Sequence, residues 1–306
     1  MMKEKLYQKS GFIIGLLAQE LMEKDVGDRI LPISEYIDKF QVSRGTIQNA
    51  FAFLKKNKAI SLRSRGHLGT YVDNIDYLLL QQCSIKDSLL GSMPLPYSAL
   101  YEGFATALYH ELSSFHFNMA YIRGAETRIR LVVQGAYDFA VCSEYAARHA
   151  IEKREPIKIL MNFGDQTYLS RHVLVLKDEN AHDIQDGMRV AYDSNSYDQK
   201  NITMQLTKGK NIQLVEMRSN QTILAISKSE IDAGIWNYDE VVEQGYQNLN
   251  IVEIDDKINT EFFSKAVIVI SNKEKALENM LMKFISPERV RQIQSDVKTG
   301  KLIPSY

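Results

Sequence analysis

A run of hydrogen-bonding side chains between residues 43 and 49 has the composition of a surface that contacts DNA bases. Arginine forms paired hydrogen bonds with guanine, and glutamine or asparagine does so with adenine. Such residues reach the bases when they occupy the leading turns of a helix in the major groove. We therefore predict DNA contacts from Ser43, Arg44, Gly45, Thr46, Gln48 and Asn49.

A predicted hairpin at residues 60–72 carries a second group of basic and small residues. Its apolar positions suit two short strands, and Gly66 and Gly69 suit the turn between them. A basic tip would contact phosphates or a minor groove, and a glycine lets the backbone approach a phosphate closely. The further predicted DNA contacts are Arg63, Arg65, His67, Gly69 and Thr70, with Ser34 from an earlier helix.

Polar residues also gather where predicted strands end in the remainder of the chain. Ligands of open α/β sheets lie beyond the carboxyl ends of the strands, where helix N-termini offer N–H groups and partial positive charge. Hydroxyls, an amide, aromatic faces and one arginine suit a small anionic metabolite, carboxylated or phosphorylated, with Arg123 as its counter-charge. The predicted effector-binding residues are Tyr97, Ser98, Arg123, Ser143, Asp165, Tyr168, Ser194, Ser196, Tyr197, Trp236, Asn237 and Tyr238.

Simpler roles for some of these residues stay open at the level of sequence. The serines at positions 98, 194 and 196 equally suit helix caps, because a serine hydroxyl accepts from a free helical N–H. Arg123 equally suits an ion pair with Glu126 or Glu144.

Sequence patterns of catalysis and metal binding are scarce. There is no G-x-S-x-G, P-loop or G-x-G-x-x-G motif. His110, Glu111 and His116 lack the histidine spacing that would place two imidazoles on one helical face. The only cysteines, Cys83 and Cys142, are too few for a structural zinc site, and Cys142 suits an inert core thiol. We predict no catalytic residue, no metal and no cofactor.

Three helices and the hairpin must position the DNA-contacting group. Apolar spacing predicts a first helix over residues 10–24, with Ser10 as its N-cap. A second helix is expected from about Ser34, which would cap it, and a third from Ser43 to about residue 57. Three residues separate the second helix from the third, which is the turn length of a helix-turn-helix.

Positive charge is concentrated in the same segment. Residues 1–75 carry twelve Lys or Arg and eight Asp or Glu, whereas the whole chain has a net charge of -1. The stretch from residue 39 to residue 70 contains no Asp or Glu beside its basic residues, which are Lys39, Arg44, Lys55, Lys56, Lys58, Arg63 and Arg65. A basic field suits the phosphate backbone of DNA, although a solvated helix face would show the same charge.

The run from Leu31 to Val72 resembles the winged-helix domain of GntR-type regulators. The shared features are a proline before the second helix, the V-S-R-G-T entry to the third helix, a leucine near its end, and a wing that closes on G-T-Y-V. The chain departs from that pattern at His67 and Leu68, which lengthen the glycine spacing of the wing, and at residues 32–35, where P-I-S-E replaces the usual segment. The resemblance implies DNA binding, and use of the fold for protein contact or RNA is the alternative.

From residue 76 apolar strands alternate with amphipathic helices, which is typical of a mainly parallel sheet covered by helices. Two similar sets occur, each with a helix, a turn, an aspartate and a small-apolar strand, at Asp138 and Asp232. We therefore predict a DNA-binding domain at residues 1–75 and a two-lobed α/β effector domain at residues 76–306. Lobe one would take about 84–170 and 260–306, and lobe two about 171–259, with crossings near Gly164–Arg171 and Asn259–Lys265.

The C-terminal part is similar to the corresponding domain of YhfZ-type regulators. The likeness rests on the segments MPLPYSALYEGFATALYHEL, YIRGAETRI, GAYDFAVCSEYAAR and KLIPSY. It extends to nearly the whole chain, because that family also carries this winged helix. The resemblance implies a type 2 periplasmic-binding-protein-like fold that serves inside the cell as a sensor, and it does not identify the ligand.

Composition is that of a globular protein without membrane association. The chain has 306 residues, of which 45% are hydrophobic and 25% charged. No apolar run approaches the roughly 20 residues that span a bilayer, and the first residues do not have the pattern of a signal peptide. Two cysteines suit a reducing compartment, so we expect a cytoplasmic protein.

These patterns predict a transcription regulator rather than an enzyme. An effector in the two-lobed domain would alter the arrangement of two winged helices in a homodimer bound to a double-stranded, pseudo-palindromic operator. The alternatives are a small-molecule-processing enzyme and a solute-binding protein, each fused to a DNA-binding domain.

Overall fold

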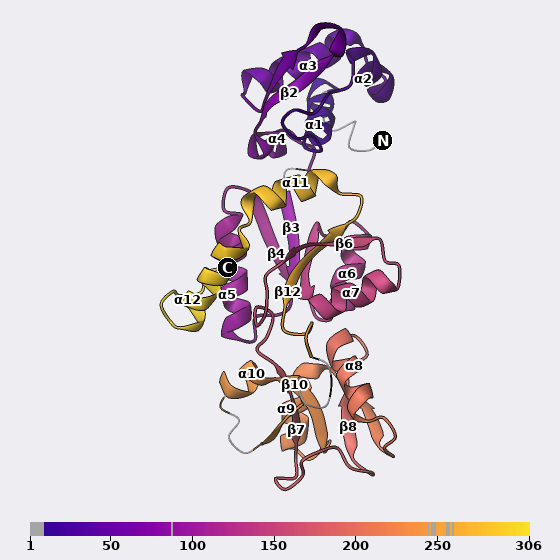
Figure 1. Ribbon diagram of the computed structural model, residues 1–306, viewed down its shortest axis with the longest axis vertical. Coiled ribbons are helices and arrows are strands. Elements are labelled where there is room, and N and C mark those ends of the chain that lie inside the picture. Colours follow the sequence, from indigo (N-terminus) through magenta and orange to yellow (C-terminus); the bar gives the residue numbers. More distant parts are fainter. Residues whose placement is uncertain (1–8, 87, 244, 246–248, 255–257, 259) are drawn as a thin grey trace. The chain divides into compact units, whose positions relative to one another are not determined.

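The structure is a computed structural model that describes residues 9–86, 88–243, 245, 249–254, 258 and 260–306 (Figure 1). Its contacts divide the chain into two compact units. The first unit contains the N-terminal segment through Leu89 together with Leu112–Asn118 and Lys273–Phe284. The second contains Leu90–Glu111, Met119–Asn272 and Ile285–Tyr306.

The first unit contains the predicted helix-turn-helix and wing. Its N-terminal elements are α1 (Lys9–Leu21), α2 (Ile33–Phe40), α3 (Arg44–Lys56), β1 (Ile60–Ser64), the short helix η2 (Gly66–Leu68), β2 (Thr70–Ile75) and α4 (Tyr77–Cys83). The strands β1 and β2 pair antiparallel as a hairpin. The unit also includes α11 (Lys275–Phe284), from which Asn279 donates a hydrogen bond to the carbonyl of Met22 at 3.2 Å.

Apolar residues at helical spacing build the core of this unit. Leu17 and Leu21 of α1 are fully buried, as are Ile47 and Leu54 of α3. Tyr36 of α2 packs edge-on against a phenylalanine of α3, with ring centroids 5.5 Å apart. The α2–α3 pair is therefore held by its inner face, which leaves the outer face of α3 exposed.

Two predicted helix caps were wrong. Ser10 lies inside α1, and Ser34 lies inside α2 because that helix already begins after Pro32. Proline suits a helix start, since its fixed φ fits and it has no N–H group to satisfy. The third cap is confirmed: Ser43 precedes α3, and its hydroxyl accepts a hydrogen bond from the Thr46 amide.

The strands of the C-terminal part form two five-stranded sheets. The first has the order β4 (His116–Tyr121), β3 (Ser88–Met93), β5 (Phe139–Ser143), β12 (Ala266–Ser271) and β6 (Ile157–Asn162). The second has the order β11 (Asn250–Glu253), β7 (His172–Leu176), β10 (Ala233–Asn237), β8 (Arg189–Tyr192) and β9 (Gln213–Glu216). In Figure 1 these sheets are separate groups of strands with helices around each.

Helices cover both sheets. Those of the first sheet are α5 (Ala99–Glu111), α6 (Ala125–Val133), α7 (Glu144–Glu152) and α12 (Pro287–Lys298) (Figure 1). Those of the second are α8 (Tyr197–Leu206), α9 (Thr222–Ser227) and α10 (Tyr238–Glu243), with the short helix η3 (Ser219–Gln221) before α9.

Each sheet is mainly parallel, as predicted, but contains one strand that runs against its neighbours. β12 pairs antiparallel with β5 and β6, and β7 pairs antiparallel with β10 and β11. β7 and β12 each follow a passage of the chain from one sheet to the other, and each enters its new sheet in the reverse direction. One predicted crossing included Asn259, which lies outside the described residues.

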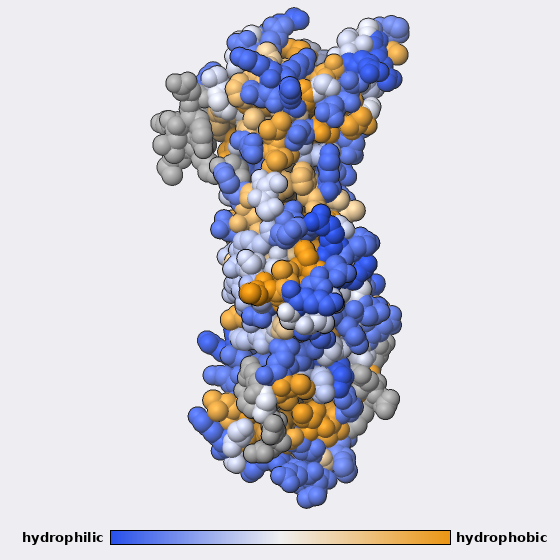
Figure 2. All heavy atoms as spheres, turned by 90° about the vertical axis from the view of Figure 1, so that its left-hand side faces the viewer, coloured by the Kyte–Doolittle hydropathy of each residue, from blue (hydrophilic) through white to orange (hydrophobic). Residues whose placement is uncertain are grey.

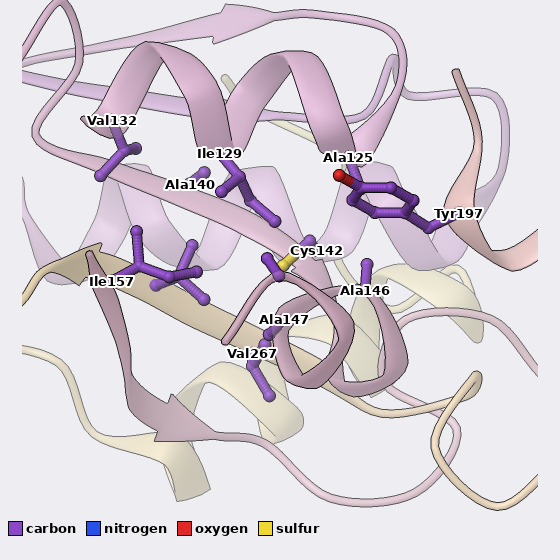
Figure 3. Packing of buried hydrophobic residues seen from close by; sticks show 12 residues of the cluster. Ala125, Ile129, Val132, Ala140, Cys142, Ala146, Ala147, Ile157, Tyr197 and Val267 are labelled. Carbon is purple, nitrogen blue, oxygen red and sulfur yellow. The ribbon is translucent and has the colours of Figure 1, made fainter. Parts of the chain in front are cut away.

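A small-residue core fixes the helices on the first sheet. Ile129 and Val132 point from α6 toward Ala140 and Cys142 of β5 (Figure 3). Tyr197, from the α8 helix of the second sheet, joins the same cluster. The two lobes thus meet in a packed contact, and the cleft between them has defined walls.

Hydrophobic residues on the surface form small separate patches among hydrophilic ones on the face seen in Figure 2. Among the residues that the structure describes, no helix has both the length and the apolar composition needed to cross a membrane.

Candidate effector cleft and DNA-contacting surface

The strand ends of the two sheets enclose a cavity of about 100 Å³. This volume is below the roughly 300–1,000 Å³ of drug-sized ligand pockets. It suits a compact ligand with few heavy atoms. Seven of the twelve predicted effector-binding residues line it: Tyr97, Arg123, Tyr168, Ser196, Tyr197, Trp236 and Asn237.

Five predicted residues lie outside this cavity lining. The Ser143 hydroxyl caps α7 and donates to a buried aspartate, whereas Ser194 donates to Glu216 at 2.7 Å on the exposed side. Asp165 lies 3.5 Å from the ammonium of Lys265. The remaining two are Ser98, which is buried, and Tyr238, whose ring lies under the guanidinium of Arg171.

Of the three serines that also suited helix caps, Ser196 does cap a helix, and it lines the cavity as well. Ser196 is the N-cap of α8, accepting from the Gln199 amide, and it also lines the cavity. Ser194 makes its side-chain contact with Glu216 and does not cap a described helix.

Arg123 is one of the residues that line the cavity. Its Nη2 donates to the hydroxyl of Tyr97 at 3.3 Å. Glu144, one of the suggested partners, instead accepts from Arg148 Nε at 2.7 Å. No ion pair connects Arg123 with any carboxylate in the described part of the chain.

Arg128 was missed from the sequence, although it is the most deeply buried cation at the cleft. Its side chain is 2% exposed and lines the cavity. It donates to the carbonyls of Val141 at 3.0 Å and Ile122 at 2.7 Å, and to the hydroxyl of Tyr168 at 3.1 Å. All three acceptors are neutral, and no carboxylate among the described residues forms an ion pair with it.

A buried guanidinium that forms no ion pair is costly, because it has lost its hydration and all its hydrogen-bond partners are neutral. It also has more N–H donors than the three that are used. An anionic ligand would supply both the charge and the acceptors. The spacing of residues along the helix could have revealed the burial of Arg128. Arg128 is three residues after Ala125 and one before Ile129, so it lies on the buried face of α6.

Other polar groups in the cleft are buried and lack partners. Trp236 is 4% exposed and His172 3% exposed, and both line the cavity. Neither the Trp236 Nε1 nor the His172 Nδ1 has a hydrogen-bond partner among the described residues. Burial lowers the pKa of His172 to about 3, so its imidazole is neutral. The indole can only donate, which again calls for an acceptor on the ligand.

Asp198 was the second residue missed. It is buried on α8, and burial raises the pKa of its carboxyl to about 7, against the opposing effects of the Ser143 hydrogen bond and the Arg128 charge. Two helices begin at the cavity, α6 after Gly124 and α8 after Ser196. Their free N–H groups add partial positive charge.

The outer face of α3 is available for contact as predicted from the sequence. Arg44, Gly45, Gln48 and Asn49 are exposed, and so is Ser34 on α2. Thr46 is half-buried because its hydroxyl pairs with that of Ser43 at 2.9 Å. These residues share the leading end of one helix and its neighbour, which is the geometry that major-groove contact needs.

The basic field around this face is smaller than the sequence indicated. Lys39 pairs with Glu20 at 2.7 Å, and Arg63 pairs with Asp73 at 2.7 Å. Both partners lie outside the stretch of residues 39–70, so the count along the sequence missed them. Arg65 lies over the ring of Tyr71, 4.6 Å from its centroid.

The tip of the wing depends on Gly69. Its φ is +101°, and a β-carbon there would lie 2.6 Å from Nε of Arg29. Arg29 forms an isolated bridge with Tyr71, which places another cation beside the wing. His67 is exposed in η2, and Thr70 is half-buried at the start of β2.

Two protein families match the chain. A family described as YhfZ C-terminal domain matches residues 76–306, and one described as helix-turn-helix domain matches residues 25–72. The chain belongs to the YhfZ family. Similar proteins in that family include YhfZ of Escherichia coli (strain K12), 27% identical over 305 residues that span 100% of both chains.

The crystal structure of YhfZ from Shigella flexneri is 25% identical, with a TM-score of 0.60, and covers 76% of this chain and 100% of that chain. The periplasmic aliphatic sulphonate binding protein SsuA from Escherichia coli has a TM-score of 0.53 at 10% identity, over 70% of this chain and 75% of that one. This chain, like YhfZ, therefore joins a helix-turn-helix, the module of DNA-binding regulators, to the fold of periplasmic binding proteins.

Proposed function

We propose that this YhfZ-family chain is a transcription regulator in which a compact anionic metabolite binds in the cleft and changes the affinity of the helix-turn-helix for a double-stranded DNA operator. The observation that carries the proposal is Arg128, a buried cleft guanidinium whose described hydrogen-bond partners are all neutral. Arg123 at the cavity and the donor of Trp236 add to the preference for an anion.

The division of labour that we propose is a DNA-binding domain at residues 1–75 and an effector domain at residues 76–306. Ligand contacts would come from the seven predicted residues that line the cavity, together with Arg128 and Asp198. DNA contacts would come from the exposed end of α3 and from the wing. A homodimer in the cytoplasm would fit a regulator that binds two half-sites.

An enzymatic role has less support. The Cys142 thiol is fully buried, and burial raises its pKa to about 12, so it is not a ready nucleophile. His172 is neutral at any physiological pH and is therefore poorly matched to general-base work near neutrality. The other polar residues that line the cavity, such as Arg123 and Arg128, are suited to binding a ligand rather than to reacting with it.

Mass spectrometry of small molecules released from the purified full chain tests the proposal. We expect an anionic compound to be retained by the wild type and by Arg130→Gln, a change at an exposed arginine of the same helix. Arg128→Gln should not retain it. Recovery of only neutral or cationic compounds, equally from all three proteins, would contradict the proposal.

A further inference from the structure

Asp198 is an acidic residue in a cleft that otherwise favours anions. It is 6% exposed, lines the cavity, and accepts a hydrogen bond from the Ser143 hydroxyl at 2.7 Å through Oδ1. Arg128 lines the same cavity and acts on Asp198 through its charge. An ionised carboxylate here would repel a bound anion, because charges are poorly screened in a buried site.

Among the ionisable side chains that interact with one another around Asp198, Asp198 is the one whose pKa lies near neutral pH. The side chains that interact electrostatically with it are Tyr101 on α5, Arg128 on α6, Cys142 on β5, Tyr145 on α7 and Tyr168 on the crossover after β6. Burial raises the pKa of the three tyrosines and of the thiol, so these groups stay neutral, and Arg128 stays charged. Burial also brings the pKa of Asp198 to about 7.

Protonation of Asp198 changes the charge of the whole cleft. The charged or ionisable acids and bases in the lining, apart from neutral His172, are Arg123, Arg128, Asp193 and Asp198. Asp193 remains occupied by the amides of Ser219 and Asn195. With Asp198 ionised the cleft has no net formal charge, whereas with Asp198 protonated it carries one positive charge and gains an O–H donor.

We propose that anion binding is coupled to the uptake of one proton by Asp198, and that the cleft therefore selects fully ionised oxyanions such as carboxylates, sulfonates or sulfates. The proton comes from solvent and forms an O–H bond on Oδ2, while Oδ1 still accepts from Ser143. The protonated carboxyl donates to a ligand oxygen. Trp236 also lines the cavity, and its Nε1 is buried and has no hydrogen-bond partner among the described residues. The inference rests on the proposed function, since it assigns a ligand class to the same cleft.

Trp236 provides the readout, because it is the only tryptophan of the sequence and lines the cavity. Its fluorescence would be titrated in the full chain with acetate, methanesulfonate and sulfate, which keep their charge between about pH 6 and pH 9. We expect the affinity of any anion that binds to fall about tenfold per pH unit above about pH 7.5. Calorimetry at about pH 8.5 in buffers of different ionisation enthalpy should show uptake of close to one proton per anion, because Asp198 of the free protein is ionised there.

Asp198→Asn mimics the protonated acid and keeps the acceptor for Ser143. This variant should bind the same anion with a pH-independent affinity that matches the wild type at low pH. Asp186→Asn, at an exposed carboxylate of the same lobe, is the matched control and should behave as the wild type.

Two results would overturn the proton coupling alone: wild-type anion affinity that is constant with pH, or loss of anion binding in Asp198→Asn. The latter would assign the ionised carboxylate to a cationic group on the ligand. If none of the three anions altered Trp236 fluorescence at any pH, the anion cleft of the proposed function would fail together with this inference.

Discussion

The hydroxyl of Ser143 donates a hydrogen bond to Asp198 at 2.7 Å, and this contact joins the end of β5 in one lobe to the start of α8 in the other. The same serine caps α7 by accepting from the Ala146 amide. A single buried side chain thus ties a helix N-terminus of lobe one to the acid that faces the cavity. The cleft is preorganised, so a ligand need not order these groups itself.

Removal of the buried cation should abolish anion binding. Arg128→Gln withdraws the charge and the N–H donors that face the cavity, and charge-assisted hydrogen bonds contribute about 1.5–3 kcal/mol each. We expect anion affinity, measured by Trp236 fluorescence, to fall about 100-fold or more. Arg130→Gln on the exposed face of α6 should leave the affinity unchanged. Equal affinities in the two variants would remove Arg128 from the site.

Asp198 should make the stability of the protein depend on pH. Its pKa is raised in the folded state, so between about pH 4 and pH 7 the folded chain holds a proton that the unfolded chain has lost. Stability from this group is therefore complete below about pH 4 and is lost as pH rises to about 7. Asp198→Asn should gain relative stability across that window, on the order of a few kcal/mol.

Denaturant unfolding at a series of pH values measures this difference. Asp186→Asn serves as the control for the loss of one carboxylate. A difference between Asp198→Asn and the wild type that stayed constant from pH 4 to pH 8 would contradict the raised pKa.

Closure of the lobes should depend on the absence of a side chain at Gly124. Its φ is +74°, and a β-carbon would lie 2.7 Å from the carbonyl oxygen of Asn195 in the opposite lobe. Gly135 has a similar φ of +70° with nothing near its β-position. Gly135→Ala should destabilise the fold by about 1 kcal/mol, because left-handed backbone is unfavourable for alanine. Gly124→Ala should destabilise it more, because its β-carbon would also meet the backbone oxygen of Asn195. Only Gly124→Ala should weaken anion binding, and an equal loss in both variants would show that the close approach to Asn195 is unimportant.

The two arginines of the wing should differ in their effect on DNA. Arg63 is neutralised by Asp73, whereas Arg65 lies over Tyr71 and forms no ion pair within the described residues. Arg65→Ala should therefore reduce the salt dependence of duplex binding by about 0.9 in the log–log slope, as expected for one phosphate contact. Arg63→Ala should have a smaller effect. Fluorescence anisotropy at several salt concentrations measures both, and the reverse order would place the phosphate contact at Arg63.

Base contact from α3 should appear as a loss of specificity. Arg44 is exposed at the first turn of that helix. Arg44→Ala should cost about 1–3 kcal/mol at one base pair and little at the others. Competition between duplexes that differ at single positions tests this. A uniform loss over all duplexes would make Arg44 a phosphate contact.

Local sequence patterns predicted the third helix and several residues of the cleft correctly. The apolar period and the cap at Ser43 located α3. Polar residues just beyond strands, such as Arg123 after β4 and Ser196 after β8, line one cavity, because ligands of α/β sheets lie beyond the carboxyl ends of the strands.

What sequence alone missed were relationships between distant segments. Strand direction leaves no trace in an alternating apolar pattern, so the antiparallel β7 and β12 were not expected. The Lys39–Glu20 ion pair joins two helices and was likewise invisible. Asp198 resembled an ordinary N-terminal helix acid, and only its burial against Arg128 and Ser143 reveals its role.

An anion held by Arg128 should change the affinity of the full chain for DNA. Duplexes selected from genomic DNA by the full chain would be titrated by fluorescence anisotropy in the presence of cellular metabolites separated by anion exchange. The retained, anionic fraction should change the affinity of the wild type about tenfold or more, which corresponds to a coupling within the usual range for allosteric proteins, and should not affect Arg128→Gln. An effect confined to the unretained fraction, or an equal response of Arg128→Gln, would contradict the account.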